Sequence, residues 1–231
     1  IDMKLIDGNP DRMIFRATLG ASETALSVNG PLGDKTNLLF SVRRSYLQFL
    51  FSAIGLPFLP TFNDYTLKLK TRFNVHNELT IISIGALDKN VLNMGIKNPT
   101  EEQQYILDYL PTNNQWNYAI GANYRHYREN SYSTLIVSRN MLYNEAVKYL
   151  NNDESSADNL TIDYSSYETE NKLRYEEVLR QNGYKFTYGA GVEYAKYQNT
   201  TFQKVFIPAG EDTVTQINYT SNLDFFKWSL F

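Results

Sequence analysis

The sequence predicts an all-β fold, in which antiparallel strands form part of an up-and-down transmembrane β-barrel. Three observations lead to this class. Aromatic residues are abundant, with 18 Tyr and 13 Phe against 12 Gly and 7 Pro, and this balance favours strands over helices. Apolar and polar residues alternate with a period of two over several segments. The connections between these segments alternate between short and long, as the turns and loops of membrane barrels do.

The clearest alternation runs from 65 to 73, where Leu67 and Leu69 share one face of the expected strand. The opposite face carries the charged side chains Lys68, Lys70 and Arg72. We expect the leucines to face lipid and the charged residues to face the barrel lumen. The same pattern recurs at 116–125 and 184–194, and more weakly at 26–30, 36–43, 79–87, 132–143, 168–179 and 224–231.

The connections sort by length, and every second one belongs to the same end of an antiparallel meander. Short turns are expected at 31–35, 74–77, 128–131 and 181–183. Long loops are expected at 45–64, 88–115, 144–167 and 198–223, all at one end of the sheet. The segment 20–24 departs from the alternation, because its position requires a long loop and its length allows only a short turn. Within the long loops, 46–54 and 101–110 are each predicted to form a short helix.

Charge and residue usage exclude several classes of function. The 22 basic and 25 acidic residues give a net charge of −3, which lacks the basic surface that nucleic-acid binding requires. No Cys is present, so neither a disulfide nor a thiolate metal site is expected. His76 and His126 are the only histidines, and we interpret both as surface residues. No arrangement of catalytic residues is recognisable, so we expect no enzyme activity, metal or cofactor.

The charged residues on the polar faces of the expected strands are the candidate site. They are Arg43, Lys68, Lys70, Arg72, Arg125, Lys172, Arg174 and Glu176. One interpretation is that they contact a domain inside the barrel or a passing ligand. The other is that they form a water-filled wall of paired charges, each of which contributes little to stability.

Particular stretches of the sequence resemble a known family. They are Gly30-Pro-Leu-Gly33, Ser41-Val-Arg-Arg-Ser-Tyr-Leu47, Ile54-Gly-Leu-Pro-Phe-Leu-Pro60 followed by Asp64, Glu170-Asn-Lys-Leu-Arg174 and Asp224-Phe-Phe-Lys-Trp-Ser-Leu-Phe231. On these residues the chain resembles the barrel of TonB-dependent outer-membrane receptors of the Bacteroidetes type, the group with a carboxypeptidase-like regulatory domain ahead of the plug.

This resemblance implies a barrel of about 22 strands filled by a plug domain. Residues 1–231 would then be part of one barrel domain, contributing about ten strands, without the plug or the remaining strands. The implied location is the bacterial outer membrane, and the implied function is active import of a siderophore, a glycan or a peptide. The implied partners are outer-membrane lipid, the plug of the same parent chain, the TonB complex and a surface lipoprotein.

Two alternative interpretations remain from the sequence. In one, the chain is a complete small barrel of about ten strands that acts as a porin-like channel or an adhesin. In the other, it is a soluble β-sandwich whose exposed aromatic residues bind a ligand.

Overall fold

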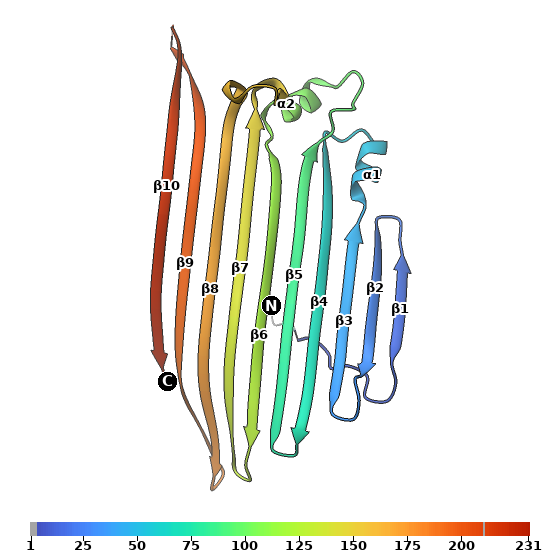
Figure 1. Cartoon of the computed structure of the whole chain (residues 1–231), viewed down its shortest axis with the longest axis vertical. Coiled ribbons are helices and arrows are strands. Elements are labelled where there is room, and N and C mark those ends of the chain that lie inside the picture. Colours follow the sequence, from blue (N-terminus) through green and yellow to red (C-terminus); the bar gives the residue numbers. More distant parts are fainter. Residues whose placement is uncertain (1–3, 210) are drawn as a thin grey trace.

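The computed structural model describes residues 4–209 and 211–231, and its strands form one antiparallel sheet of ten strands. The order of strands in the sheet follows the chain, so each strand pairs with the next one (Figure 1). The strands are β1 (Ile14–Leu19), β2 (Glu23–Pro31), β3 (Thr36–Ser45), β4 (Phe58–Asn74), β5 (Asn77–Leu92), β6 (Thr112–Tyr127), β7 (Ser131–Tyr149), β8 (Leu160–Gln181), β9 (Tyr184–Ala209) and β10 (Glu211–Leu230). The predicted all-β, up-and-down fold of about ten strands is therefore confirmed.

Eight of the nine segments predicted from alternation lie within strands β2 to β9, and the ninth, 224–231, extends one residue beyond the end of β10. The prediction did not assign β1, whose six residues are too few for a clear period of two. The predicted loop at 198–223 is wrong: β9 continues to Ala209 and β10 begins at Glu211. The two strands pair throughout this stretch, for example Gln198 with Asn222. Polar residues occupy both faces there, so the apolar–polar alternation disappears although the backbone remains paired.

The long connections gather at one end of the sheet, which we call the loop end, and the short turns at the other, the turn end (Figure 1). The two predicted helices are present in these loops as α1 (Leu47–Ala53) and α2 (Glu101–Tyr109). All three loops are shorter than predicted, spanning 46–57, 93–111 and 150–159, because the flanking strands extend into the predicted loops. The third loop contains two 3₁₀ turns, η1 (Leu150–Asn152) and η2 (Ala157–Asn159). Three of the four predicted loops therefore emerge together, as expected.

The turn between β1 and β2 lies at the loop end although it contains only three residues. Tyr46 closes this turn, because its hydroxyl donates to the backbone oxygens of Gly20 at 2.5 Å and Glu23 at 3.0 Å. The Tyr46 backbone N–H donates to the Ser22 oxygen at 2.9 Å. Tyr46, the residue after β3, thus packs over the short β1–β2 turn. The alternation of short and long connections would place a long loop at this position.

Helix α2 begins where its sequence allows a capping box. The Thr100 hydroxyl accepts from the Gln103 N–H at 3.2 Å, and the Gln103 side chain accepts from the Thr100 N–H at 2.8 Å. Glu101 and Glu102 occupy its first turn, where negative charge is favourable. Among the described residues, no helix is long and apolar enough to cross a membrane.

The sheet lacks the packed core of a soluble domain. Its accessible surface is 15720 Å², whereas a compact monomer of this mass exposes about 10,700 Å². Leu107 and Val178 are the only buried hydrophobic side chains among the described residues. The described strands form one sheet rather than two, and β1 and β10 lie at its unpaired edges. The soluble sandwich and the complete small barrel are therefore both wrong.

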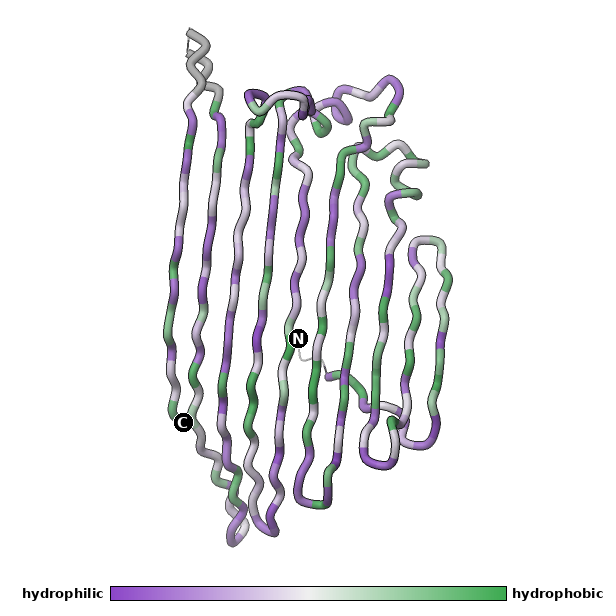
Figure 2. The backbone as a smooth tube through the Cα atoms, viewed as in Figure 1, coloured by the Kyte–Doolittle hydropathy of each residue, from purple (hydrophilic) through white to green (hydrophobic). Residues whose placement is uncertain are grey.

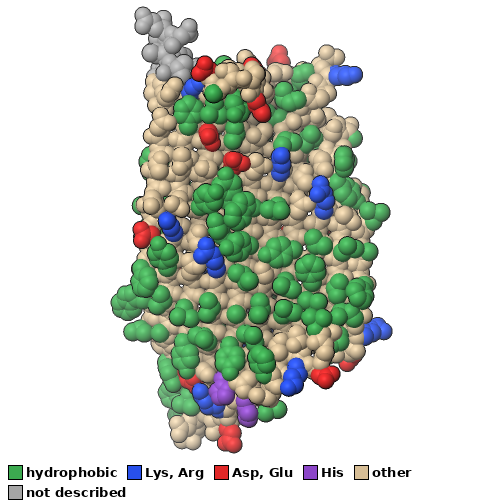
Figure 3. All heavy atoms as spheres, viewed as in Figure 1, with side chains coloured by type: hydrophobic (Ala, Val, Ile, Leu, Met, Phe, Trp, Pro, Cys, Tyr) green, Lys and Arg blue, Asp and Glu red, His purple; other side chains and the backbone are tan. Residues whose placement is uncertain are grey.

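The strand register divides the side chains into two faces. We call the face that carries Leu67 the outer face and the face that carries Lys68 the inner face. Apolar and polar residues alternate along most strands (Figure 2). The outer face of β9 is apolar from Tyr184 to Tyr194, about the length of one membrane crossing. Figure 3 shows hydrophobic side chains over much of this face, with few charges between mid-height and the bottom rim.

Aromatic side chains of neighbouring strands contact one another on the outer face toward the loop end. The Trp116 and Tyr143 rings lie 5.9 Å apart, and the Tyr143 and Tyr167 rings lie 4.6 Å apart. These three residues are register partners on β6, β7 and β8. They form an aromatic belt at one border of the apolar surface, as barrel strands do at a membrane interface.

Candidate functional site

All eight candidate residues lie on the inner face. Lys68, Lys70 and Arg72 alternate along β4, and the register carries the inner face across the sheet to Lys172, Arg174 and Glu176 on β8. The alternation therefore gave their face correctly. They form separate groups, because β4 and β8 are four strands apart, or about 19 Å at the usual strand spacing.

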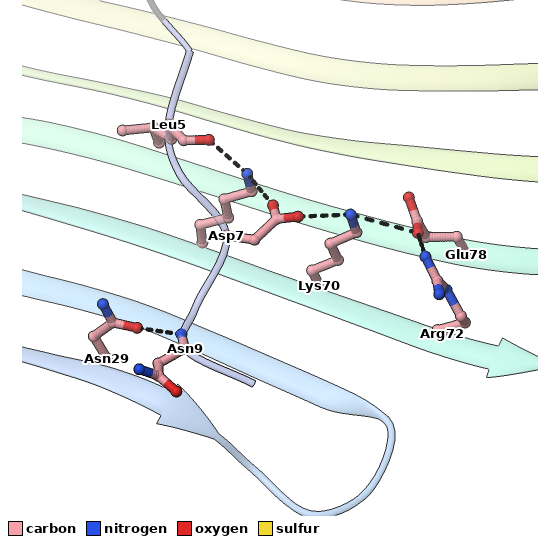
Figure 4. A network of polar contacts seen from close by, with 8 residues as sticks. Leu5, Asp7, Asn9, Asn29, Lys70, Arg72 and Glu78 are labelled. Atoms are coloured by element: carbon pink, nitrogen blue, oxygen red, sulfur yellow. Dashed lines mark hydrogen bonds and ion pairs between the residues drawn. The ribbon is translucent and has the colours of Figure 1, made fainter. Parts of the chain in front are cut away.

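The first group holds the N-terminal segment 4–12 against the inner face (Figure 4). Asp7 lies between two lysines, with Lys68 Nζ at 2.6 Å from Oδ1 and Lys70 Nζ at 2.7 Å from Oδ2. Lys68 Nζ also donates to the Leu5 backbone oxygen at 2.8 Å. Further along the segment, the Asn9 N–H donates to Asn29 Oδ1 of β2 at 2.5 Å. The basic row of β4 thus binds a peptide segment through a carboxylate and a carbonyl.

The same row continues toward the turn end through Glu78 of β5. Its Oε2 atom lies 3.5 Å from Lys70 Nζ and 3.2 Å from an Arg72 terminal nitrogen. The Glu78 side chain is buried, with 7% of its surface exposed. Alternating positive and negative groups therefore run from Asp7 to Arg72, which lowers the repulsion among the three cations.

The two lysines set the ionisation of Asp7. Their hydrogen bonds hold the pKa of the Asp7 carboxyl below its ordinary value of 3.8. Asp7 is charged whenever the segment lies in this position near neutral pH. The Lys68 side chain is 9% exposed, because the segment covers it, so it is not part of an open water-filled wall.

Gly8 allows the segment to lie close to β3. A Cβ atom on this residue would lie 2.6 Å from the Leu38 backbone oxygen and 3.1 Å from the Asn37 Cβ. Any larger residue would lift the segment from the sheet. The contact therefore depends on a small residue next to Asp7 as well as on charge.

The second group lies on β8, β9 and β10 and mixes both signs of charge. Lys172 Nζ is 2.8 Å from Glu170 and 3.6 Å from Glu193, and Lys227 Nζ is 3.8 Å from Glu193. Arg174 pairs with Glu176 at 2.9 Å and lies over the Phe231 ring at 4.3 Å. These pairs are partly exposed, so each contributes little to stability. They leave a polar, charge-balanced wall.

A hollow of about 620 Å³ lies beside this second group, on the side of the loop end. Its inner-face lining includes Asn140, Leu142, Glu168, Glu170, Tyr197 and Phe225. The Asn140 side chain donates to Glu170 Oε2 at 2.9 Å. Carboxylates, an amide and aromatic rings thus share one concave area, a combination suited to a polar ligand with an apolar part.

The other two candidates stand apart. Arg43 lies nearer the loop end, where it bonds Asp64 at 2.9 Å and Glu23 at 3.2 Å. Arg125 makes no ion pair within residues 4–209 and 211–231. The structure therefore does not bring the eight candidates together as a single site.

The sequence did not indicate the acidic partners Asp7 and Glu78. Asp7 belongs to a segment outside the strands, so alternation gives no signal for it. A two-residue turn at 75–76 with regular register would place Glu78 opposite Phe73, on the outer face. A register shift between Arg72 and Asn74 instead pairs Glu78 with Arg72, which brings its carboxylate to the inner face.

Polar side chains tie the first two long loops to each other. Gln103 of α2 donates to the Gly55 oxygen at 2.8 Å, and the buried Asn93 side chain donates to the Leu56 oxygen at 2.9 Å. Lys148 at the end of β7 donates to the oxygens of Leu107 at 2.6 Å and Leu110 at 3.2 Å, and to Asn152 Oδ1 at 2.6 Å. The loops therefore form an ordered layer at the loop end.

The described part of the chain contains no group of three or more His, Cys, Asp or Glu residues that is arranged to hold a metal ion. Both histidines lie near the turn end. His76 Nδ1 is 3.1 Å from the Tyr127 backbone oxygen, and His126 Nδ1 is 2.8 Å from Asn77 Oδ1. Each histidine therefore has a local structural partner.

The sequence matches no family model and no curated protein. Solved structures match the fold. A mutant of the ferric enterobactin receptor PfeA from Pseudomonas aeruginosa has 14% identity and a TM-score of 0.53 over 88% of this chain and 33% of its own. The ferric yersiniabactin uptake receptor FyuA from Yersinia pestis has 13% identity and a TM-score of 0.49 over 97% and 37%. The open form of the ferric-catecholate import receptor Fiu from Escherichia coli has 11% identity and a TM-score of 0.47 over 97% and 45%.

The similarity to the Pseudomonas aeruginosa receptor shows the fold: the chain has the fold of part of an outer-membrane receptor barrel. It spans about a third of that receptor's length. The three structures are named as receptors, and none is named as an enzyme.

Proposed function

We propose that this chain forms part of the barrel wall of a TonB-dependent outer-membrane receptor that imports a bound nutrient. The observation that carries the proposal is the division of the sheet into an apolar outer face and a polar inner face on which the N-terminal segment lies. The receptor-barrel fold supports it. So does the gathering of the long loops at one end, which is the extracellular end of such barrels.

The outer face supports a position in lipid. Large hydrophobic side chains such as Phe186, Tyr188 and Val192 on β9 are exposed, at 54%, 54% and 39%. Leaving apolar surface in water costs about 25 cal/mol per Å², and no second layer of the described chain covers this face. Acyl chains would cover it between the aromatic belt and the turn end.

The inner face supports a plug inside the barrel. Segment 4–12 already lies there, held by the basic row of β4. A plug domain of the same parent chain would meet this wall and the mixed wall of β8 to β10. We assign the eight candidate residues to contacts with that plug or with the passing ligand.

The remaining parts of the proposal follow from the resemblance of Gly30 to Asp64, and of the two later stretches, to Bacteroidetes-type receptors. They are energy transfer from the TonB complex, a surface lipoprotein that binds the loop end, and a siderophore, glycan or peptide as the nutrient. The hollow beside Glu168 and Glu170 is suited to a ligand with both polar and apolar parts.

Deletion of the gene in the native bacterium tests the transport function. Growth is measured with ferric siderophores, glycans and peptides, each as the limiting source of iron or carbon, in the deletion strain, in a strain lacking the TonB protein, and after complementation. We expect one nutrient class for which both deletions stop growth and complementation restores the first. Normal growth of the deletion strain on every class, or growth that continues without TonB, would contradict the proposal.

A further inference from the structure

Arg139 on β7 is a charged residue within a mainly apolar part of the outer face. Its neighbours on that face along the strand are Val137 and Met141, and its side chain is exposed. No carboxylate lies within ion-pair distance of it among the side chains of residues 4–205 and 215–231. An arginine on the lipid face of a barrel costs about 2–4 kcal/mol at the bilayer midplane, so this position favours a negatively charged partner.

The contacts of Arg139 within the chain are neutral and leave donors available. Its Nε donates to the Tyr118 hydroxyl at 3.0 Å, one terminal nitrogen donates to Asn171 Oδ1 at 2.9 Å, and the other lies 4.0 Å from Met141 Sδ. A guanidinium carries five N–H donors. These contacts orient the group without neutralising its charge.

An apolar hollow of about 530 Å³ begins beside this arginine. Arg139 and Asn171 line it together with Ile81, Ala122, Val137, Leu173, Val192 and Tyr194. Val137, Leu173 and Val192 each lie two residues nearer the turn end than the row of Arg139, Asn171 and Tyr194. The hollow therefore extends from the polar pair away from the loop end.

Arg139 lies between the apolar surface and the aromatic belt, four residues from Tyr143 of that belt on the same strand. On β9 the apolar run ends at Tyr194, and the next outer-face residue is Lys196. The same change occurs on β10. Toward the loop end, the outer-face residue Phe226 is followed by Asp224, which is the register partner of Lys196. Arg139 is the outer-face cation that lines the hollow, whereas Lys196 does not line it. In the proposed orientation this border of the apolar surface faces the outer leaflet.

We propose that Arg139, with Asn171 and Tyr118, binds the phosphate of an outer-leaflet lipid whose acyl chain occupies the adjacent hollow. The inference rests on the proposed membrane position of the outer face. A guanidinium pairs well with a phosphate group, and the arrangement matches the direction of a lipid in that leaflet. The phosphate lies toward the loops and the chain toward the bilayer centre.

Lipid binding by the purified full-length protein tests the site. Native mass spectrometry in detergent compares bis-phosphorylated lipid A with the same lipid stripped of its phosphates, for wild type, Arg139→Gln and Arg180→Gln. The control Arg180 is on the adjacent strand β8 and lies on the inner face. We expect wild type and Arg180→Gln to prefer the phosphorylated lipid by about tenfold, the effect of one charge-assisted contact, and Arg139→Gln to lose this preference. Retention of the heat-resistant folded band on gels verifies folding of each variant.

Two results would overturn the site: an unchanged preference in Arg139→Gln, or no preference in wild type. Binding of inorganic phosphate by wild type without retention of the phosphorylated lipid would also overturn it, because the site would then bind the ion and not the lipid. Failure of the wild type to insert into phosphatidylcholine vesicles would contradict the proposed membrane position itself. Insertion without phosphate preference would refute this inference alone.

Discussion

At the scale of the residue, the period of two in the sequence determines which face of the sheet a side chain occupies. The residues around that side chain in the folded protein determine whether it contacts water, lipid or another segment. Leu67 and Lys68 lie on opposite faces as predicted. Lys68 is nevertheless covered by the N-terminal segment rather than by water. Each of the two interpretations of the charged residues, a contact site or a wall of paired charges, therefore holds for some of them. Lys68 binds a peptide segment, whereas Lys172 belongs to an open wall of ion pairs.

Substitution of Leu67 tests the assignment of faces. Leu67→Arg should lower the free energy of unfolding by about 2–4 kcal/mol, because it places a charge in the acyl chains. Thr66→Arg, on the adjacent inner-face position, should change it by roughly 1 kcal/mol or less. Reversible folding of the full-length protein into vesicles, followed in denaturant, measures both. Equal losses for the two variants would mean that the outer face does not contact lipid.

Acid should release the N-terminal segment. The pKa of Asp7 is lowered by Lys68 and Lys70, so the contact is fully present above the ordinary value of 3.8 and is lost as pH falls through the lowered pKa. A spin label on Ile6→Cys, whose native side chain is 67% exposed, should become mobile only below that ordinary value.

Two variants of the spin-labelled protein separate Asp7 from general effects of acid. Asp7→Asn should make the label mobile at every pH, because the neutral amide loses both ion pairs. Asp11→Asn should leave the profile unchanged, because Asp11 makes no ion pair among the described residues. A label that stays immobile down to pH 2 in the wild type would contradict the role of Asp7.

At the scale of the element, strand ends and loops depend on contacts that no single segment contains. The shift between Arg72 and Asn74 turns Glu78 toward the inner face, although regular pairing would turn it outward. The β9 and β10 strands continue beyond their apolar portions because each pairs with the other. The polarity of residues 198–223 therefore predicted a loop, although the backbones of β9 and β10 pair with each other there.

Lys148 should fix the position of helix α2. Its ammonium group satisfies the oxygens of Leu107 and Leu110 at the helix C-terminus, so Lys148→Met should destabilise this region by about 2 kcal/mol. Hydrogen exchange of residues 101–111 should increase in the variant. Lys97→Met, an exposed lysine in the same loop, is the control and should leave exchange unchanged. Equal exchange in both variants would show that α2 is held by its own capping box and the Gln103 contact.

At the scale of the whole molecule, the outer and inner faces should meet different solvents. Val137 and Ser138 are adjacent on β7 and face opposite sides, and the chain has no native Cys. In vesicles, Ser138→Cys should react with a water-soluble maleimide, whereas Val137→Cys should stay unreacted until detergent replaces the bilayer. Equal reactivity of the two cysteines in vesicles would contradict the proposed division of lipid and lumen.

The sequence by itself determined the alternating portions of strands β2 to β10, the up-and-down order, the two helices in the loops and the face of each candidate residue. These features depend on local backbone geometry, because successive side chains of a strand point to opposite sides. The tertiary structure decided the extended pairing of β9 with β10, the inward turn of Glu78 and the position of Asp7 between Lys68 and Lys70. Each of these depends on contact between residues distant in the chain, and a period of two carries no information about such contacts.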